Sequence, residues 1–157
     1  MKNLRVINLR DSHYLIKTPD FTGVSNLEKL VLEGCTSLVE VHSSIGFLKR
    51  LSLLNLKCRW RLKILPNRFV AESLHILILS SCVNVKEILE SGVNKEEPSE
   101  LWLDGTGIEK LPMSLIKHST KVSPLDLSKC RDLVCIPSSI CTMTSLQKLI
   151  LKTVLEA

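Results

Sequence analysis

The chain has 157 residues and a formal net charge of +5; 45% of its residues are hydrophobic and only 4% are aromatic. The charge is too small and too spread out to indicate a nucleic-acid partner. No apolar run reaches the span of about 18 residues that a membrane helix needs. The length allows one domain, and the composition indicates a core of aliphatic side chains.

A single spacing of apolar residues recurs from one end of the chain to the other. Its clearest copy covers 122–145 and has the form L-x-x-L-x-L-x-x-C-x-x-L-x-x-L-P-x-x-I-x-x-M. The unit begins, in steps of 23 or 24 residues, at Leu4, Leu27, Leu51, Leu74, Pro98, Val122 and Leu146. Such a period is the signature of leucine-rich repeats, so we predict one domain of about six and a half repeats over 1–157.

Each repeat starts with apolar residues that alternate with polar ones, which predicts a strand, and then turns back to start the next repeat. We therefore expect an α/β solenoid. It is a leucine-rich-repeat horseshoe with a curved parallel sheet on its concave face and short turns, 3-10 or helical segments on its convex face. One repeat cannot bury its apolar side alone, and neither end of the chain carries a polar cap. We expect the chain to be part of a longer array.

One slot marks where each repeat leaves the sheet. It is filled in order by Ser12, Cys35, Arg59, Cys82, Thr106, Cys130 and Val154. We predict that the three cysteines are buried thiols that donate to a neighbouring carbonyl. Other residues separate them along the ladder, so we expect no disulfides there and a reducing compartment.

The third repeat breaks this pattern. A guanidinium cannot be buried without a partner, so we expect the turn to shift and Cys58 to point inward in place of Arg59. The basic residues Lys57, Arg59, Arg61 and Lys63 surround Trp60. We interpret this run as a solvated turn, with a phosphate-binding patch as the alternative.

Other polar residues are interpreted as parts of turns. Ser43 and Ser44 can cap a short helical turn in the second repeat, and His42 before them is a rim residue. The segment Asp104-Gly105-Thr106-Gly107 lacks the pattern of a nucleotide-binding loop, so its glycines are assigned to a tight turn.

Nothing in the sequence predicts a catalytic, cofactor-binding or metal site. The four histidines lie at unrelated positions of the repeat, at His13, His42, His75 and His118. None accompanies a nucleophile as in a catalytic triad, and no H-x-x-x-H or paired-cysteine spacing indicates a metal. An enzyme is therefore the least favoured class.

The residues between the inward leucines of each strand should face the concave side. At the central position these are Asn8, Val31, Asn55, Ile78, Trp102, Asp126 and Ile150. Leu53, Ile76, Ile78 and Trp102 should form one apolar patch, with the composition of a protein-binding hot spot. The alternative is ordinary strand propensity. Pro124 removes one hydrogen-bond donor from a central strand.

The candidate protein-binding residues combine this patch with the polar residues around it. They are Val31, Leu53, Asn55, Lys57, Ile76, Ile78, Glu100, Trp102, Asp104 and Asp126.

Three phrases together resemble one family. They are MKNLRVINLRDSHYLIKTPDFTGVSNLEKLVLEGCTSLVEVHSSIGFLKRLSLLNLK, LILSSCVNVKEI and LWLDGTGIEKLP. They are similar to the leucine-rich repeats of plant TIR-type nucleotide-binding disease-resistance receptors. The resemblance implies a segment of a cytoplasmic or nuclear immune receptor that recognises a pathogen effector or host protein and helps to hold the receptor inactive.

The resemblance implies no enzymatic activity for this chain. The TIR and nucleotide-binding domains of the family precede the repeats and are not present here, so neither NAD cleavage nor ATP binding is carried over. Docking on the receptor's own nucleotide-binding domain, or a generic intracellular scaffold, are the alternatives to direct effector binding. No nucleic acid and no membrane are expected as partners.

Overall fold

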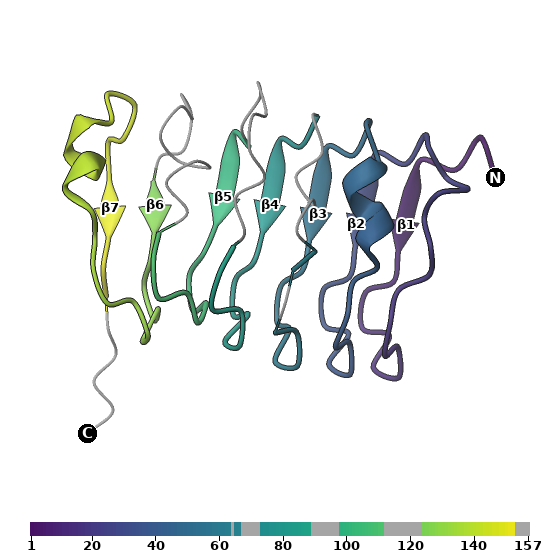
Figure 1. Cartoon of the computed structure of the whole chain (residues 1–157), viewed down its shortest axis with the longest axis horizontal. Helices are drawn as coiled ribbons and strands as arrows, with labels where there is room; N and C mark the ends of the chain where they lie inside the picture. The colour runs from purple at the N-terminus through teal and green to yellow at the C-terminus, as the bar shows by residue number, and fades with distance from the viewer. Residues whose placement is uncertain (64, 67–72, 89–97, 112–123, 153–157) are drawn as a thin grey trace.

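The computed structural model describes residues 1–63, 65, 66, 73–88, 98–111 and 124–152, and short parallel strands recur through this part of the chain (Figure 1). The strands are β1 (Val6–Asn8), β2 (Lys29–Val31), β3 (Leu53–Asn55), β4 (Ile76–Ile78), β5 (Glu100–Trp102), β6 (Leu125–Asp126) and β7 (Leu149–Ile150). The first five begin two residues into a predicted repeat. The repeat start at Val122 and the ladder position Val154 lie outside the described residues.

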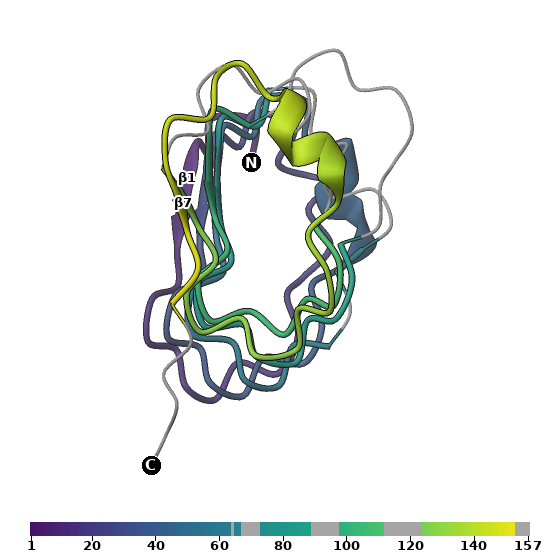
Figure 2. The ribbon, with the colours of Figure 1, turned by 90° about the vertical axis from the view of Figure 1, so that its left-hand side faces the viewer.

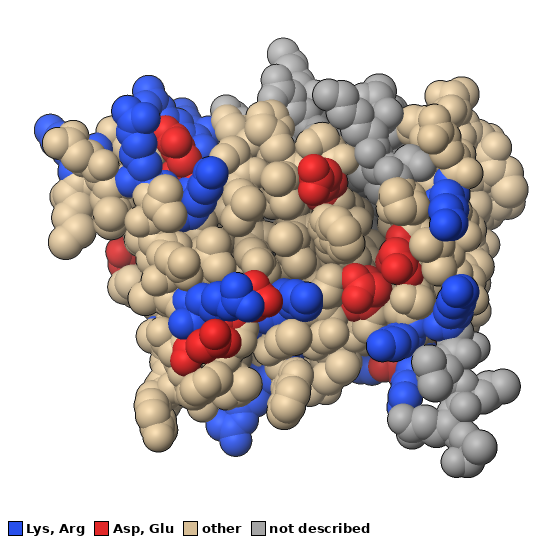
Figure 3. All heavy atoms as spheres, turned by 180° about the vertical axis from the view of Figure 1, so that it is seen from behind, with Lys and Arg blue, Asp and Glu red and all other residues tan. Residues whose placement is uncertain are grey.

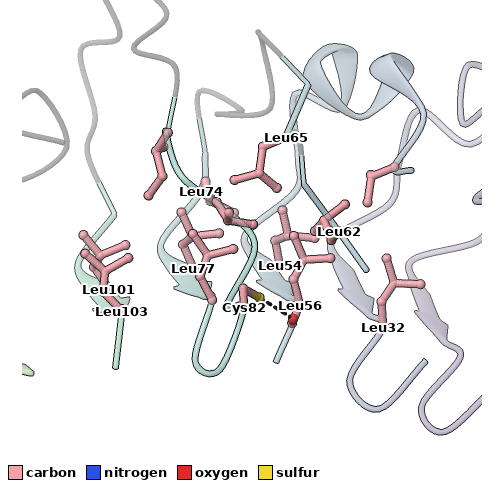
Figure 4. Packing of buried hydrophobic residues seen from close by; sticks show 14 of the residues in the cluster. Leu32, Leu54, Leu56, Leu62, Leu65, Leu74, Leu77, Cys82, Leu101 and Leu103 are labelled. Atoms are coloured by element: carbon pink, nitrogen blue, oxygen red, sulfur yellow. Dashed lines mark hydrogen bonds between the residues drawn. The ribbon is translucent and has the colours of Figure 1, made fainter. Parts of the chain in front are cut away.

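The strands pair without any stagger. Ile7 lies opposite Leu30, Leu30 opposite Leu54, Leu54 opposite Leu77, and Leu77 opposite Leu101. Because alternate residues of a strand point to opposite faces, this column forms one wall of the core. Figure 4 shows leucines from successive repeats stacked in the interior.

The wall opposite the strands is built from short turns. It carries two 3-10 helices, η1 (Ser43–Phe47) and η2 (Ser138–Thr142), which Figure 2 shows across the coil from the sheet. The predicted fold class is thereby confirmed: a parallel-strand solenoid with short helical turns opposite the sheet. It is the architecture of a leucine-rich-repeat protein.

The cap of η1 corrects one expectation. His42 is the N-cap residue, and its Nδ1 accepts a hydrogen bond from the backbone N–H of Ser44 at 3.2 Å. Ser44 instead uses its Oγ to accept the N–H of Phe21, one repeat earlier, at 2.8 Å. The Ser44 hydroxyl links two repeats, so the imidazole of His42 caps the helix.

The cysteine ladder is confirmed. The thiols of Cys35, Cys82 and Cys130 donate to the carbonyls of Leu9, Leu56 and Leu103 at 2.9, 3.1 and 3.1 Å. The Cys82 bond is dashed in Figure 4. Burial raises the pKa of Cys82 to about 12, so the thiol stays protonated. All six cysteines are free.

The prediction for Cys58 and Arg59 is wrong. In every described turn, the residue just before the ladder slot has a left-handed backbone: Asp11, Gly34, Cys58, Ser81, Gly105 and Lys129, with φ between 58 and 72°. Their N–H groups bond to the next repeat, and that of Cys58 donates to the Ser80 carbonyl at 2.9 Å. Moving Cys58 inward would break this ladder, so Arg59 takes the slot and is fully buried.

The buried guanidinium is poorly satisfied. Nε, Nη1 and Nη2 of Arg59 have no hydrogen-bond partner among the described residues. Burial lowers the pKa of Arg59, and the nearby thiols of Cys35, Cys82 and Cys58 oppose that shift. A buried group without partners is destabilising.

The described strands form two sheets, β1 to β5 and β6 with β7, where the sequence indicated one. The reason is Pro124. At the equivalent position of earlier strands, the N–H groups of Ile76 and Glu100 each donate to the carbonyl of the preceding repeat at 2.9 Å. Proline has no N–H to offer Ser99 in this way. Outside the strands, the fifth and sixth repeats stay joined by the bond from Gly105 N–H to the Ser128 carbonyl at 2.7 Å, by the Cys130 thiol on the Leu103 carbonyl, and by Val134 N–H on the Glu109 carbonyl at 3.0 Å.

Candidate protein-binding face

The outward side of the strands forms an open surface, here called the outer sheet face. It is defined by three rows of side chains along the solenoid. The first is Val6, Lys29, Leu53, Ile76 and Glu100; the second Asn8, Val31, Asn55, Ile78, Trp102, Asp126 and Ile150; the third Arg10, Glu33, Lys57, Ser80, Asp104, Ser128 and Lys152. Figure 3 views the molecule from this side.

The apolar residues singled out in the sequence come together at the middle of this face. Leu53 on β3 lies opposite Ile76 on β4, and Ile78 on β4 lies opposite Trp102 on β5. The aliphatic three are partly covered, whereas Trp102 is 49% exposed. The result is a small apolar patch with an indole at its edge. Val31 lies one strand away, opposite Asn55.

Two predicted binding residues also hold the ends of their strands. The side-chain oxygen of Asn55 accepts the N–H of Lys57 at 3.0 Å, and that of Asp126 accepts the N–H of Ser128 at 2.8 Å. Asn8 does the same for Arg10 at 3.1 Å. These are Asx turns, in which the side-chain oxygen accepts the backbone N–H of the residue two positions later and so ends the strand. The recurring Asx residue at the last strand position was a usable sequence signal.

Sequence reasoning missed the part played by Glu33. Its carboxylate receives the Asn55 amide at 3.2 Å and the Arg10 guanidinium at 3.5 Å, so it joins three repeats across the outer sheet face. The Arg10 pair is exposed and contributes little stability. Its effect is to hold the charged groups of this half in place.

The acidic residues gather on the other half. Glu100, Asp104 and Asp126 lie on or just after β5 and β6, beside Trp102. Asp104 accepts the hydroxyl of the buried Ser80 at 2.5 Å. The side chains of Lys57 and Glu100 make no hydrogen bond or ion pair within the described part of the chain. Figure 3 shows the consequence: a largely uncharged centre, a mixed blue and red row over one half, and separate carboxylates over the other half, with further basic groups beyond them toward the C-terminal end.

The described histidines form no common site. His13 contacts Thr36, His42 caps η1, and the backbone carbonyl of His75 accepts a hydroxyl from Ser99. His118 lies outside the described residues. No group of three or more metal-ligating side chains occurs in the part that the structure describes. Nor do the same residues include a helix long and apolar enough to cross a membrane.

Stacked repeats, an aliphatic core and an open outer sheet face define a leucine-rich-repeat solenoid, and the comparisons place it more narrowly. The chain is 38% identical over 149 residues to TMV resistance protein N from Nicotiana glutinosa. It is 37% identical over 138 residues to disease resistance protein RPP2A and 37% identical over 129 residues to RPS4B, both from Arabidopsis thaliana. No family model matches the chain.

These matches confirm the resemblance drawn from the sequence. They cover 95, 88 and 81% of this chain. The chain is related to the leucine-rich-repeat regions of plant TIR-type nucleotide-binding disease-resistance receptors. It spans 13% of the first relative and 10% of each of the other two.

Proposed function

We propose that this chain is a non-catalytic protein-recognition module of a plant immune receptor and that it binds a pathogen effector or host protein on the outer sheet face. The observation that carries the proposal is Trp102 on β5, the last strand of the five-stranded sheet, where it is half exposed beside Ile78. The relatives support the setting of plant disease resistance. The proposed site of action is the cytoplasm or nucleus.

The physical argument rests on what a partner would cover. A tryptophan at the centre of an interface is a frequent hot spot, because its large ring loses contact with water when the partner docks. The acidic residues Glu100, Asp104 and Asp126 surround it and would select a partner with basic groups at the rim. Asn55 and Asp126 are already oriented by their strand-ending bonds.

The test uses the full chain as bait against a library of pathogen-secreted proteins. Trp102→Ala, and the double variant Ile78→Asp with Trp102→Asp, should lower the affinity of the chain for each captured partner by roughly 30-fold or more, as expected for a hot spot. Tyr14→Asp is the matched control, since Tyr14 is 96% exposed and lies outside the outer sheet face. Far-UV circular dichroism checks that each variant keeps its fold.

Partners that bind the Trp102 variants as tightly as the wild-type chain would rule out this face. A second arm addresses the docking alternative by co-expressing the chain with the nucleotide-binding domain of a related receptor. If the chain captures that domain without any pathogen protein, and the Trp102 variants do not, the outer sheet face would be assigned to a contact within the receptor.

A further inference from the structure

A second candidate surface lies on the wall away from the sheet. A hollow of about 930 Å³ opens beside η1, between the return segments of the second and third repeats. We call it the return-wall pocket. Val41 and Leu65, both almost fully buried, provide apolar residues in its lining. Its volume lies at the upper end of the range of about 300 to 1,000 Å³ that is typical of ligand sites.

The apolar part of the pocket is unusually accessible. Phe47, at the end of η1, contributes to the lining and is 65% exposed, and Val39, also in the lining, is 38% exposed. Exposed apolar side chains that gather in one concave place indicate a binding surface more than singly scattered ones do. A partner with an aliphatic or aromatic side chain could therefore remove these groups from water.

The charged part of the pocket is unbalanced. Three cations, Lys17, Arg61 and Lys63, share the lining with a single carboxylate, Glu40. Lys17 Nζ lies 2.8 Å from Glu40 Oε2. The hydrogen bond and charge of Lys17 keep the pKa of Glu40 below its usual value, so this carboxylate stays ionised.

Arg61 and Lys63 have no such partner. Neither side chain forms an ion pair or hydrogen bond with any residue in the described part of the chain. They come from the basic run that the sequence singled out. The turn divides that run: Arg59 is buried in the core, while Arg61 and Lys63 flank the buried Leu62 and line the pocket.

From this arrangement we infer that the return-wall pocket binds an acidic segment of a protein partner, with Asp or Glu carboxylates on Arg61 and Lys63 and an adjacent apolar side chain against Phe47. Charge complementarity selects the acid, because the pocket has unmatched cations and its one carboxylate is already paired. The planar guanidinium of Arg61 suits a two-point contact with a carboxylate. This site is separate from the outer sheet face.

The test selects peptides from a random display library on the immobilised full chain. Enriched sequences should combine Asp or Glu with Leu, Phe or Trp. Binding of synthetic copies of these peptides is measured by fluorescence anisotropy. Their affinity for the double variant Arg61→Glu with Lys63→Glu should be about tenfold or more lower than for the wild-type chain, because attraction between opposite charges becomes repulsion between like charges. Raising the salt concentration should also weaken binding of the peptides to the wild-type chain.

The matched control reverses the same number of charges elsewhere. Lys110 and Lys129 are exposed and do not line the pocket, so Lys110→Glu with Lys129→Glu should bind the peptides within about twofold of the wild-type chain. Phe47→Ser should weaken binding even at high salt, because it removes the apolar contact. Circular dichroism confirms that the variants are folded.

Three outcomes would overturn the inference. They are the absence of any enriched peptide, enrichment of peptides without carboxylates, and unchanged binding to the Arg61 and Lys63 variant. Trp102→Ala separates this site from the proposed function. The peptides should bind that variant as tightly as the wild-type chain. Loss of peptide binding in that variant would show that the peptides bind the outer sheet face instead.

Discussion

At the scale of single residues, Arg59 shows how a repeat imposes a position on a side chain that does not suit it. The slot is filled by cysteine in the second, fourth and sixth repeats, where a thiol donates to a carbonyl one repeat away. Arg59 is fully buried at the same slot and its three guanidinium nitrogens lack partners among the described residues. It stays there because Cys58 is held by the turn.

We therefore predict that Arg59→Cys stabilises the chain. The substitution removes unpartnered buried donors and places a thiol in reach of the Leu32 carbonyl, as at the neighbouring cysteines. The free energy of unfolding should rise by about 1 to 3 kcal/mol, the usual effect of a buried unsatisfied group. The measurement is the midpoint of urea denaturation.

Arg61→Cys is the control for this prediction. It changes the same residue types two positions along, at an exposed site, and should leave the urea midpoint nearly unchanged. A lower midpoint for Arg59→Cys would mean that the arginine stem fills space that a thiol cannot. The view of Arg59 as a destabilising residue would then be abandoned.

At the scale of one repeat, the fifth unit is distinctive because it is a residue shorter after the ladder slot. The next core residue comes two positions after Thr106, at Ile108, whereas Val85 follows Cys82 by three. The shorter path draws Gly107 against the fourth repeat. A Cβ placed on Gly107 would lie 2.0 Å from the Val83 carbonyl oxygen.

Gly107→Ala should accordingly destabilise the chain. The clash involves backbone atoms, which cannot move aside as a flexible side chain can, and would also disturb the bond from Gly107 N–H to the Cys82 carbonyl at 3.2 Å. The expected loss is about 1 to 3 kcal/mol, as for other overpacked sites. Urea denaturation followed by circular dichroism measures it.

The chain offers a matched glycine for comparison. A Cβ on Gly23 meets no atom within 4 Å, so Gly23→Ala should be neutral or slightly stabilising. Equal effects of the two substitutions would show that the fourth and fifth repeats can separate without loss. The close approach at Gly107 would then have no structural importance.

At the scale of the whole molecule, cohesion depends on hydrogen bonds between neighbouring repeats, and these are unevenly distributed. Four strand pairings join β1 to β5, while β6 and β7 pair only with each other in the described part. The turn-side bonds of the left-handed residues continue across the gap at Gly105 and Ser128. Solenoid stability is roughly a sum of such neighbour terms.

Native-state hydrogen exchange should reveal this weak joint. The amides of Leu125 and Leu127, bonded to β7 and its flanks at 2.9 and 2.8 Å, should open at a lower free energy than that of Leu56, bonded to Ile78 at 2.8 Å. Pro124→Ala restores a donor for the Ser99 carbonyl. This substitution should narrow the difference in opening free energy between these amides and that of Leu56 by about 1 kcal/mol, the net value of a backbone hydrogen bond.

Pro19→Ala serves as the control, because Pro19 is exposed and lies outside the strands. It should leave the exchange of Leu125 unchanged. If the amides of β3 and β6 open at the same free energy in the wild-type chain, the molecule unfolds as one unit. The gap between β5 and β6 would then carry no energetic weight.

The sequence by itself determined the features that follow from period. Alternation within each strand and a step of 23 or 24 residues leave one register, because slipping by a single residue would turn every core leucine to solvent. The inward column at Leu30, Leu54 and Leu77 and the neighbouring positions of Ile78 and Trp102 could therefore be predicted. So could the buried cysteine thiols.

Only the tertiary structure decided how each repeat bonds to the next. The burial of Arg59, the gap caused by Pro124 and the cap at His42 depend on hydrogen bonds between residues that lie near each other only when the coil is closed. The same is true of the return-wall pocket, which brings Lys17 and Lys63 together from different repeats. A periodic pattern specifies which residues face inward, whereas contacts between successive coils decide whether each polar group finds a partner.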